Sequence, residues 1–498
     1  MELYPALPGA RFAMSPFLHY FRAQWAPSVP RELMAGAVAT FALIPEVIAF
    51  SFVAGVDPSV GLFASFVISI VIAFAGGRPA MVSAAAGSVA LVAAPLVQAH
   101  GLQYLLAAGL LAGAMQVLFG WLRLGVLLRF VSGSVRTGFV NALAVLIFAA
   151  QLPHLVGANG ATWAMLALGL VVIYGLPRIS TAIPSPLICI LVLTGTAHAL
   201  DLPLKTVADL GHLPATLPSW ALPDVPLSLQ TLQLIALPAL AIAMVGLLES
   251  LMTASVVDEQ TDTPSAKNRE CSGLGLANIA ASCFGGIAGC GMIGQSVSNV
   301  RYGGRGRLST LFAGAFLLGL MVLLKPWVAQ VPVVALVAIM VMVSASTLDW
   351  GSARALLKHP KLSSLVMLAT VVVTIATHNL AAGVAVGVLL SGVFFMFKVS
   401  RLLQVQRSGD AELVYAVRGQ LFFASADLLV DAFDVREIEG RPVRIDMAQA
   451  HLWDITAVQA LAKVCARLRK HGSAVRVTGL NAQSQALAAR LDLRLDGV

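Results

Sequence analysis

Long apolar segments with almost no charge occupy the first 400 residues of the chain. Residues 1–400 hold 19 Lys/Arg and 13 Asp/Glu, so 8% of them are charged, against about 25% in an ordinary soluble domain. A helix needs about 20 apolar residues to cross ~30 Å of hydrocarbon. The sequence therefore predicts an α-helical polytopic membrane protein and excludes a soluble enzyme. Fourteen membrane segments are predicted, at about 33–55, 58–75, 80–98, 102–119, 124–151, 161–177, 183–200, 229–257, 271–284, 291–301, 308–324, 331–348, 361–377 and 379–400.

The end of the chain has a different composition. Residues 401–498 hold 13 Lys/Arg and 11 Asp/Glu, so 24% of them are charged, as in a soluble domain. Two strands are predicted around Gly419, and alternating strands and helices follow, which is typical of a small α/β domain. We expect a cytoplasmic N-terminal segment at 1–32, a transmembrane transporter domain at 33–400 and a cytoplasmic domain at 401–498.

The positions of the basic residues predict the orientation. With the N-terminus in the cytoplasm and fourteen crossings, nineteen of the Lys and Arg residues from Arg11 to Arg407 lie inside. Only Lys205 and Lys325 lie outside. This asymmetry follows the positive-inside rule and predicts a multi-pass protein of the cytoplasmic (inner) membrane with both termini in the cytoplasm. The net charge of +8 is then a topology signal, so no nucleic-acid partner is expected.

Two features recur in the two halves of the membrane part, which are predicted at 33–200 and 229–400. The first segment of each half carries one acid, Glu46 or Glu249. A glycine pair precedes a short segment in each half, with eleven residues from Gly77 to Ser88 and ten from Gly286 to Ser296. Recurring short, Gly-interrupted segments are typical of transporters built from two inverted repeats. The sequence therefore predicts two inverted seven-segment repeats.

The two short segments predict an anion site. The stretches at 79–83 and 287–291 are expected to be extended, so that two helices begin near the bilayer centre. Their unpaired N–H groups and positive dipole ends would face each other. The candidate substrate-binding residues at these helix starts are Gly87, Ser88, Gly294, Gln295 and Ser296. The alternative is that Gly, Ala and Ser occur there only for close helix packing.

Glu46 and Glu249 are candidates for proton coupling. A carboxylate in the bilayer centre costs about 2.5–3.5 kcal/mol or more, so it usually faces a cavity. A protonated acid would also remove its repulsion of an anionic substrate. Thr253 lies one turn from Glu249 and is expected to help line the cavity. The alternative is a carboxyl group that hydrogen-bonds a neighbouring helix or pairs with an arginine.

Several long motifs resemble a known family. I-P-E-V-I-A-F-S, G-V-D-P-S-V-G-L-F-A-S-F and G-G-R-P-A-M-V-S-A-A-A-G-S are similar to the opening of sulfate permease (SulP) anion transporters. G-L-L-E-S-L-M-T-A and M-I-G-Q-S-V-S-N-V-R-Y-G-G-R-G-R-L-S resemble their eighth and tenth segments. Y-A-V-R-G-Q-L-F-F-A-S and H-L-W-D-I-T-A-V resemble the STAS domain that follows in that family.

The resemblance implies a fourteen-helix membrane part with core and gate domains, a cytoplasmic STAS domain and a homodimer. It also implies a substrate site between segments 3 and 10, with segments 1 and 8 alongside. Many members have a basic residue near the start of segment 10, where this chain has Gln295. Without a fixed positive charge at this position, the dipoles of the two short helices would recognise the anion.

The predicted function is secondary active transport: proton-coupled symport of an oxyanion or a dicarboxylate such as fumarate, by alternating access. Its expected partners are a small anion, protons and the lipid bilayer. The five cysteines form no C-x-x-C pair, so neither a metal site nor a cofactor is expected. Alternatives are sodium-coupled bicarbonate or sulfate uptake, anion exchange, and a membrane-anchored STAS signalling scaffold. A nucleobase–cation symporter is disfavoured, because no acid lies between Gly291 and Val300.

Overall fold

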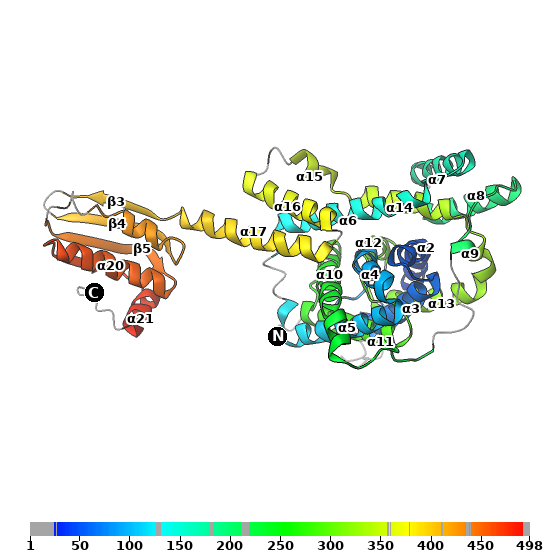
Figure 1. The fold of residues 1–498 in the computed structure, drawn as a ribbon, viewed down its shortest axis with the longest axis horizontal. Coiled ribbons are helices and arrows are strands. Elements are labelled where there is room, and N and C mark those ends of the chain that lie inside the picture. Colours follow the sequence, from blue (N-terminus) through cyan, green and yellow to red (C-terminus); the bar gives the residue numbers. More distant parts are fainter. Residues whose placement is uncertain are drawn as a thin grey trace, which may run out of the picture. The chain divides into compact units, whose positions relative to one another are not determined.

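A computed structural model describes residues 24–25, 27–125, 131–179, 184–210, 219–355, 358, 360–377, 379–409, 412–434, 438 and 440–491. Three basic residues assigned to the cytoplasmic side, Arg11, Arg22 and Arg129, lie outside these ranges, as does most of the predicted segment 1–32. The chain divides into two compact units, Met1–Val388 and Leu389–Val498, and each is described by itself (Figure 1).

Each of the fourteen predicted segments contains a helix. Seven of the described helices are long and apolar enough to cross a membrane, and five further apolar helices have 10–17 residues. The number of crossings therefore stays a prediction. The helices are α2 (Val29–Ala54), α3 (Pro58–Ala75), α4 (Gly87–His100), α5 (Leu102–Trp121), α6 (Gly133–Ala149), α7 (Gly160–Ile179), α8 (Ser185–Ala199), α10 (Leu229–Thr261), α11 (Lys267–Cys283), α12 (Ile293–Arg301), α13 (Arg307–Ala329), α14 (Val333–Thr347), α16 (Lys361–Thr377) and α17 (Leu380–Ser400). Three short elements lie between them: η2 (Leu152–His154), α9 (Val207–Leu210) and α15 (Trp350–Ala355).

The helices of the first unit form two groups (Figure 1). In one group, α2 to α5 pack with α10 to α13. In the other group, α6, α7 and α8 pack with α14 and α16. The first four predicted segments of each half thus lie in one group, and later segments of each half lie in the other. The first four segments of the two predicted halves therefore pack together.

A small antiparallel sheet joins the two halves. Strand β1 (Ser83–Ala85) pairs with strand β2 (Gly289–Gly291), and Ala84 lies opposite Cys290 at the centre. Helices α4 and α12 each begin three residues after this central pair. The register therefore makes Ser88 equivalent to Gly294. The sequence spacing, which matched Ser88 with Ser296, was wrong by two residues.

The first strand lies at 83–85, so it overlaps the extended stretch predicted at 79–83 only at Ser83, and residues 79–80 form a turn. Ala80 has a φ of 61°, in the left-handed region, and its N–H donates to the Gly306 carbonyl at 3.1 Å. The second extended stretch, predicted at 287–291, contains β2 at its end. Each strand is therefore shorter than expected, and each is followed directly by a helix start.

Side chains of flanking helices satisfy the outer edges of both strands. Ser69 on α3 donates to the Ser83 carbonyl at 2.8 Å, and Ser65 accepts from the N–H of Ala85 at 3.1 Å. On the other edge, Asn278 on α11 accepts from the N–H of Gly289 at 2.8 Å. Irregular backbone is tolerated at membrane depth only where its polar groups are satisfied within the protein. These contacts explain how two short strands persist among membrane helices.

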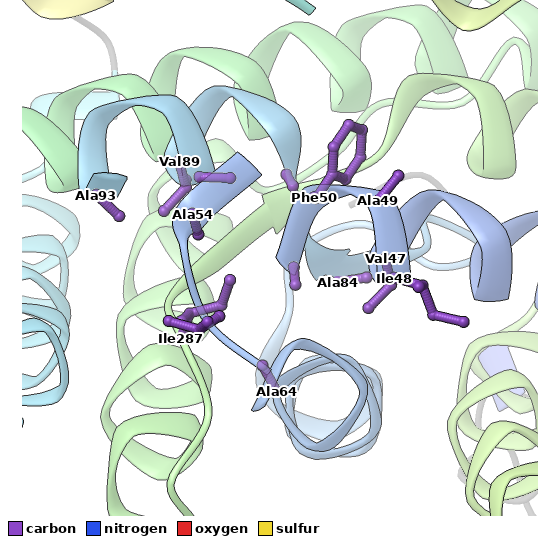
Figure 2. Close-up of a cluster of buried hydrophobic side chains, with 14 of the residues drawn as sticks. Val47, Ile48, Ala49, Phe50, Ala54, Ala64, Ala84, Val89, Ala93 and Ile287 are labelled. Atoms are coloured by element: carbon purple, nitrogen blue, oxygen red, sulfur yellow. The ribbon is translucent and has the colours of Figure 1, made fainter. Parts of the chain in front are cut away.

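The second half of α2 packs against this sheet. Figure 2 shows its side chains, from Val47 to Ala54, gathered with residues of α3, β1 and α4 and with Ile287. The Phe50 ring lies directly on the start of α4, because a Cβ at Gly87 would be 2.6 Å from the Phe50 Cε1 atom. Only glycine therefore fits at position 87 beside this ring.

The second unit is a small mixed sheet with helices. It contains β3 (Gln404–Ser408), β4 (Leu413–Leu421), α18 (Ala426–Asp431), β5 (Val443–Leu452), α20 (Ile455–Lys470), β6 (Val475–Thr478) and α21 (Ala482–Arg490). The strand order is β3-β4-β5-β6, with β3 antiparallel to β4 and the other neighbours parallel. The predicted break at Gly419 was wrong: β4 continues through this glycine, whose φ is 114°. The pairing of β4 with β5 shifts in register between Ala416 and Arg418, just before this glycine.

Candidate functional site

A cavity of about 570 Å³ lies between the two helix groups of the first unit. One wall is formed by α2, α4, α10 and α12, and the other by α6, α14 and the start of α8. Residues that lie more than 200 positions apart in the sequence therefore face each other across it. This position places the starts of both short helices, α4 and α12, at the cavity wall.

The residues that line the cavity differ in their exposure to solvent. Phe50, Phe139 and Ser88 are buried. Arg301 and Ser346, near the ends of α12 and α14, are exposed. In the predicted orientation both helices end on the cytoplasmic side, so the exposed lining residues would lie toward the cytoplasm.

Backbone N–H groups at two helix starts line the cavity. Gly87 and Ser88 open α4, and Ile293, Gly294 and Gln295 open α12. The preceding residues, one alanine and one methionine, provide no side-chain cap to either helix. The first N–H groups of a helix have no partner within the helix, and they carry its positive dipole end. Two such ends at one cavity favour the binding of an anion.

The Gln295 side chain adds a hydrogen-bond donor to this anion site. It is 1% exposed. The carboxyl group of Glu46 lies beside it and is its side-chain hydrogen-bond partner. The Nε2 group has two N–H donors, so it can donate to Glu46 and to a ligand in the cavity.

The two cavity acids have different surroundings. Glu249 is nearly buried, and its Oε2 atom accepts hydrogen bonds from the Ser88 hydroxyl and the Cys290 thiol. Glu46 is less buried, follows Pro45 inside α2 and lines the cavity. Besides these acids, Arg301 is the charged side chain among the described residues that line the cavity.

The structure brings six of the eight predicted site residues to the cavity, namely Gly87, Ser88, Gly294, Gln295, Glu46 and Glu249. It does not bring Thr253 or Ser296 there. Thr253 donates to the Gly291 carbonyl at 2.8 Å, and the Ser296 hydroxyl accepts from the N–H of Val82 at 2.9 Å. Both hydroxyls therefore satisfy backbone groups around the small sheet, and neither residue is among those that line this cavity.

Sequence reasoning missed two lining residues that a helical pattern could have indicated. Ser298 and Arg301 follow Gln295 at intervals of three residues, so all three share one face of α12 and line the cavity. From the sequence, Arg301 is expected chiefly to be a topology signal, with attraction of anions to the inner mouth as the alternative. Cys290 was missed without such a signal, because its contact with Glu249 depends on how β2 crosses α10.

Comparisons with known proteins agree with the fold. Residues 30–166 and 158–370 match the sulfate permease family, and residues 403–495 match the STAS domain. The chain is 50% identical to the "Putative sulfate transporter YbaR" of Bacillus subtilis (strain 168), over 94% of this chain and 98% of that protein.

Two solved structures share the fold. The transmembrane domain of a cyanobacterial bicarbonate transporter, BicA, has a TM-score of 0.65 and 25% identity, over 72% of this chain and 98% of that one. The murine Solute Carrier 26 family member A9 anion transporter, in the inward-facing state, has a TM-score of 0.83 at 17% identity. That match covers 99% of this chain and 94% of the murine one.

Proposed function

From the premise that the chain belongs to the sulfate permease family and carries a C-terminal STAS domain, we propose that it is a proton-coupled anion symporter. At the family level it is an anion transporter and a multi-pass integral membrane protein, not an enzyme. The proposed substrate is an oxyanion or a dicarboxylate such as fumarate, carried by alternating access. We further propose fourteen crossings of the inner membrane, cytoplasmic termini and a homodimer.

The meeting of two helix starts at one cavity is the observation that carries the proposed substrate site. The starts of α4 and α12 and the Gln295 amide all line it. These groups can donate hydrogen bonds, and none of them needs a fixed positive charge to attract an anion. The proposed binding residues are Gly87, Ser88, Gly294 and Gln295. The proposed role of Thr253 and Ser296 is to hold the backbone behind them.

Proton coupling is proposed because two acids lie at an anion site. An ionised carboxylate beside the bound anion repels it, and protonation of the carboxylate removes this repulsion. Anion and proton therefore bind best together, which is the requirement for symport. Glu46 and Glu249 are the proposed coupling residues.

The proposal is tested with the purified full-length protein in proteoliposomes. Uptake of fumarate, sulfate and bicarbonate is measured with an inward proton gradient, with an inward sodium gradient and with neither. We expect uptake of at least one of these anions to rise with the proton gradient. Stimulation by sodium alone would replace proton coupling with sodium coupling, and uptake only against a trapped internal anion would indicate exchange.

Replacing Gln295 by Ala is expected to weaken anion binding. The variant removes a buried donor to a charged ligand, so KM for the transported anion should rise about ten-fold, while maximal uptake changes less. Gln103→Ala is the matched control, because Gln103 is exposed and lies away from the cavity lining. Equal KM values for both variants would contradict the proposed role of Gln295.

A further inference from the structure

The two cavity acids occupy the first helix of each half, yet their partners differ. Helix α10 packs on α4, and α2 packs on α12, so the contacts of Glu249 and Glu46 can be compared position by position. The sheet register makes Ser88 equivalent to Gly294 and Cys290 equivalent to Ala84. If the halves were alike, each acid would meet the same pair of donors.

Glu249 is held by one donor from each side. The Ser88 hydroxyl reaches it from the start of α4, and the Cys290 thiol reaches it from β2 at 3.0 Å. Ser88 and Cys290 also lie 3.7 Å apart, so the three side chains form one cluster. All three are buried, and the carboxyl group of Glu249 therefore bridges α10, α4 and β2.

Glu46 has no such bridge. At the equivalent positions, Gly294 has no side chain and Ala84 has only a methyl group, and neither side chain can donate a hydrogen bond. Its neighbour on α12 is Gln295, whose equivalent on α4 is Val89. Glu46 is the less buried acid of the two, and it lines the cavity with the Gln295 amide as its side-chain partner.

We infer that Glu249 is a positioning residue, held by Cys290 and Ser88, that fixes the helix starts of the anion site. This inference rests on the proposed function and divides its two coupling residues. The titratable groups that face Glu249 are the Cys290 thiol on β2 and the Glu46 carboxyl on α2. Glu46 faces Glu249, and Arg301 lines the same cavity from the end of α12.

The bridge matters because it sets the geometry of the anion site. The donors of that site are N–H groups at the starts of α4 and α12, and a hydrogen bond tolerates only a few tenths of an ångström of displacement. The carboxyl of Glu249 ties the first turn of α4 to the strand that leads into α12. Cys290 is therefore assigned to the anion site although it does not line the cavity.

Substitution of Cys290 tests the positioning role. Cys290→Ser keeps a donor of similar size, whereas Cys290→Ala removes it. Anion binding to the detergent-purified full chain is measured with sulfate and fumarate, and uptake is measured in proteoliposomes. We expect Cys290→Ala to weaken binding about ten-fold, and Cys290→Ser to stay within about two-fold of the wild type. Equal values for both variants would overturn the assignment of Cys290.

Glu249→Gln tests the division between the acids. An amide keeps the size of the side chain but accepts hydrogen bonds more weakly than a carboxylate. We expect a lower uptake rate and a higher KM, with the remaining uptake still stimulated by the proton gradient. Loss of that stimulation, in a variant that still binds the anion, would overturn the inference.

The proposed function can fail separately. A wild-type protein that takes up anions without any response to a proton gradient would contradict proton coupling, before any variant is compared. The contrast between Cys290→Ser and Cys290→Ala in anion binding does not depend on protons. That contrast therefore decides the positioning role in either case.

Discussion

Glu46→Gln is expected to abolish proton-driven accumulation of the anion while leaving anion binding nearly unchanged. A gradient of one pH unit corresponds to about 1.4 kcal/mol, which supports about ten-fold accumulation when one proton accompanies each anion. Glutamine resembles the protonated acid in shape and charge, but it releases no proton. The ratio of internal to external anion should therefore fall to about one in the variant, because no driving force remains.

The measurement uses proteoliposomes whose membrane potential is clamped, so that only the proton gradient drives uptake. Binding of the same anion to the purified protein shows that the variant is folded. Glu259→Gln is the matched control, because Glu259 is an exposed acid near the end of α10. Accumulation by Glu46→Gln at the wild-type level would exclude Glu46 as the coupling acid.

Gly289→Ala is expected to have the largest effect on stability. A Cβ at this position would lie 2.0 Å from the Ala84 carbonyl oxygen and 2.8 Å from the Ile68 Cδ1 atom. The carbonyl belongs to the paired strand, so it cannot move away without breaking the contact between β1 and β2. Overpacking of this kind costs about 3 kcal/mol, and the apparent Tm of the purified protein should fall by several degrees.

Gly195→Ala is the control for the added methyl group. Gly195 lies in α8, and a Cβ there would meet no atom within 4 Å. Alanine also favours a helix over glycine, so this variant should be at least as stable as the wild type. Equal Tm values for both variants would contradict the prediction, because they would show that the strand pair accommodates the added methyl group.

Features that depend on neighbours in the chain were predictable. The free energy of transfer of a segment into the bilayer depends on the residues of that segment alone. The positions of all fourteen helices could therefore be expected from the sequence. The glycine pairs likewise indicated where the helical pattern breaks. Glu46 and Glu249 stood out because ionisable residues are rare in apolar segments, and both line the cavity.

Predictions that compared the halves by counting residues were less successful. The spacing from the glycine pairs matched Ser88 with Ser296, whereas the strand register matches Ser88 with Gly294. Counting residues along the chain assumes that the turn before β1 and the turn before β2 have the same length and conformation. The left-handed backbone at Ala80 is a feature of the turn before β1. The strand break predicted at Gly419 was wrong for a related reason: a neighbouring strand holds the glycine in register.

The sequence by itself determined the class of the protein, its two-part organisation and six of the residues at the cavity, because burial of apolar and charged groups in a bilayer is a local free-energy term. Only the tertiary structure decided that Thr253 and Ser296 serve the backbone and that Cys290 meets Glu249. Those contacts depend on the register of β1 against β2 and on the packing of α10 against the short helices α4 and α12. Such geometry joins segments far apart in the chain, and no local pattern of residues encodes it.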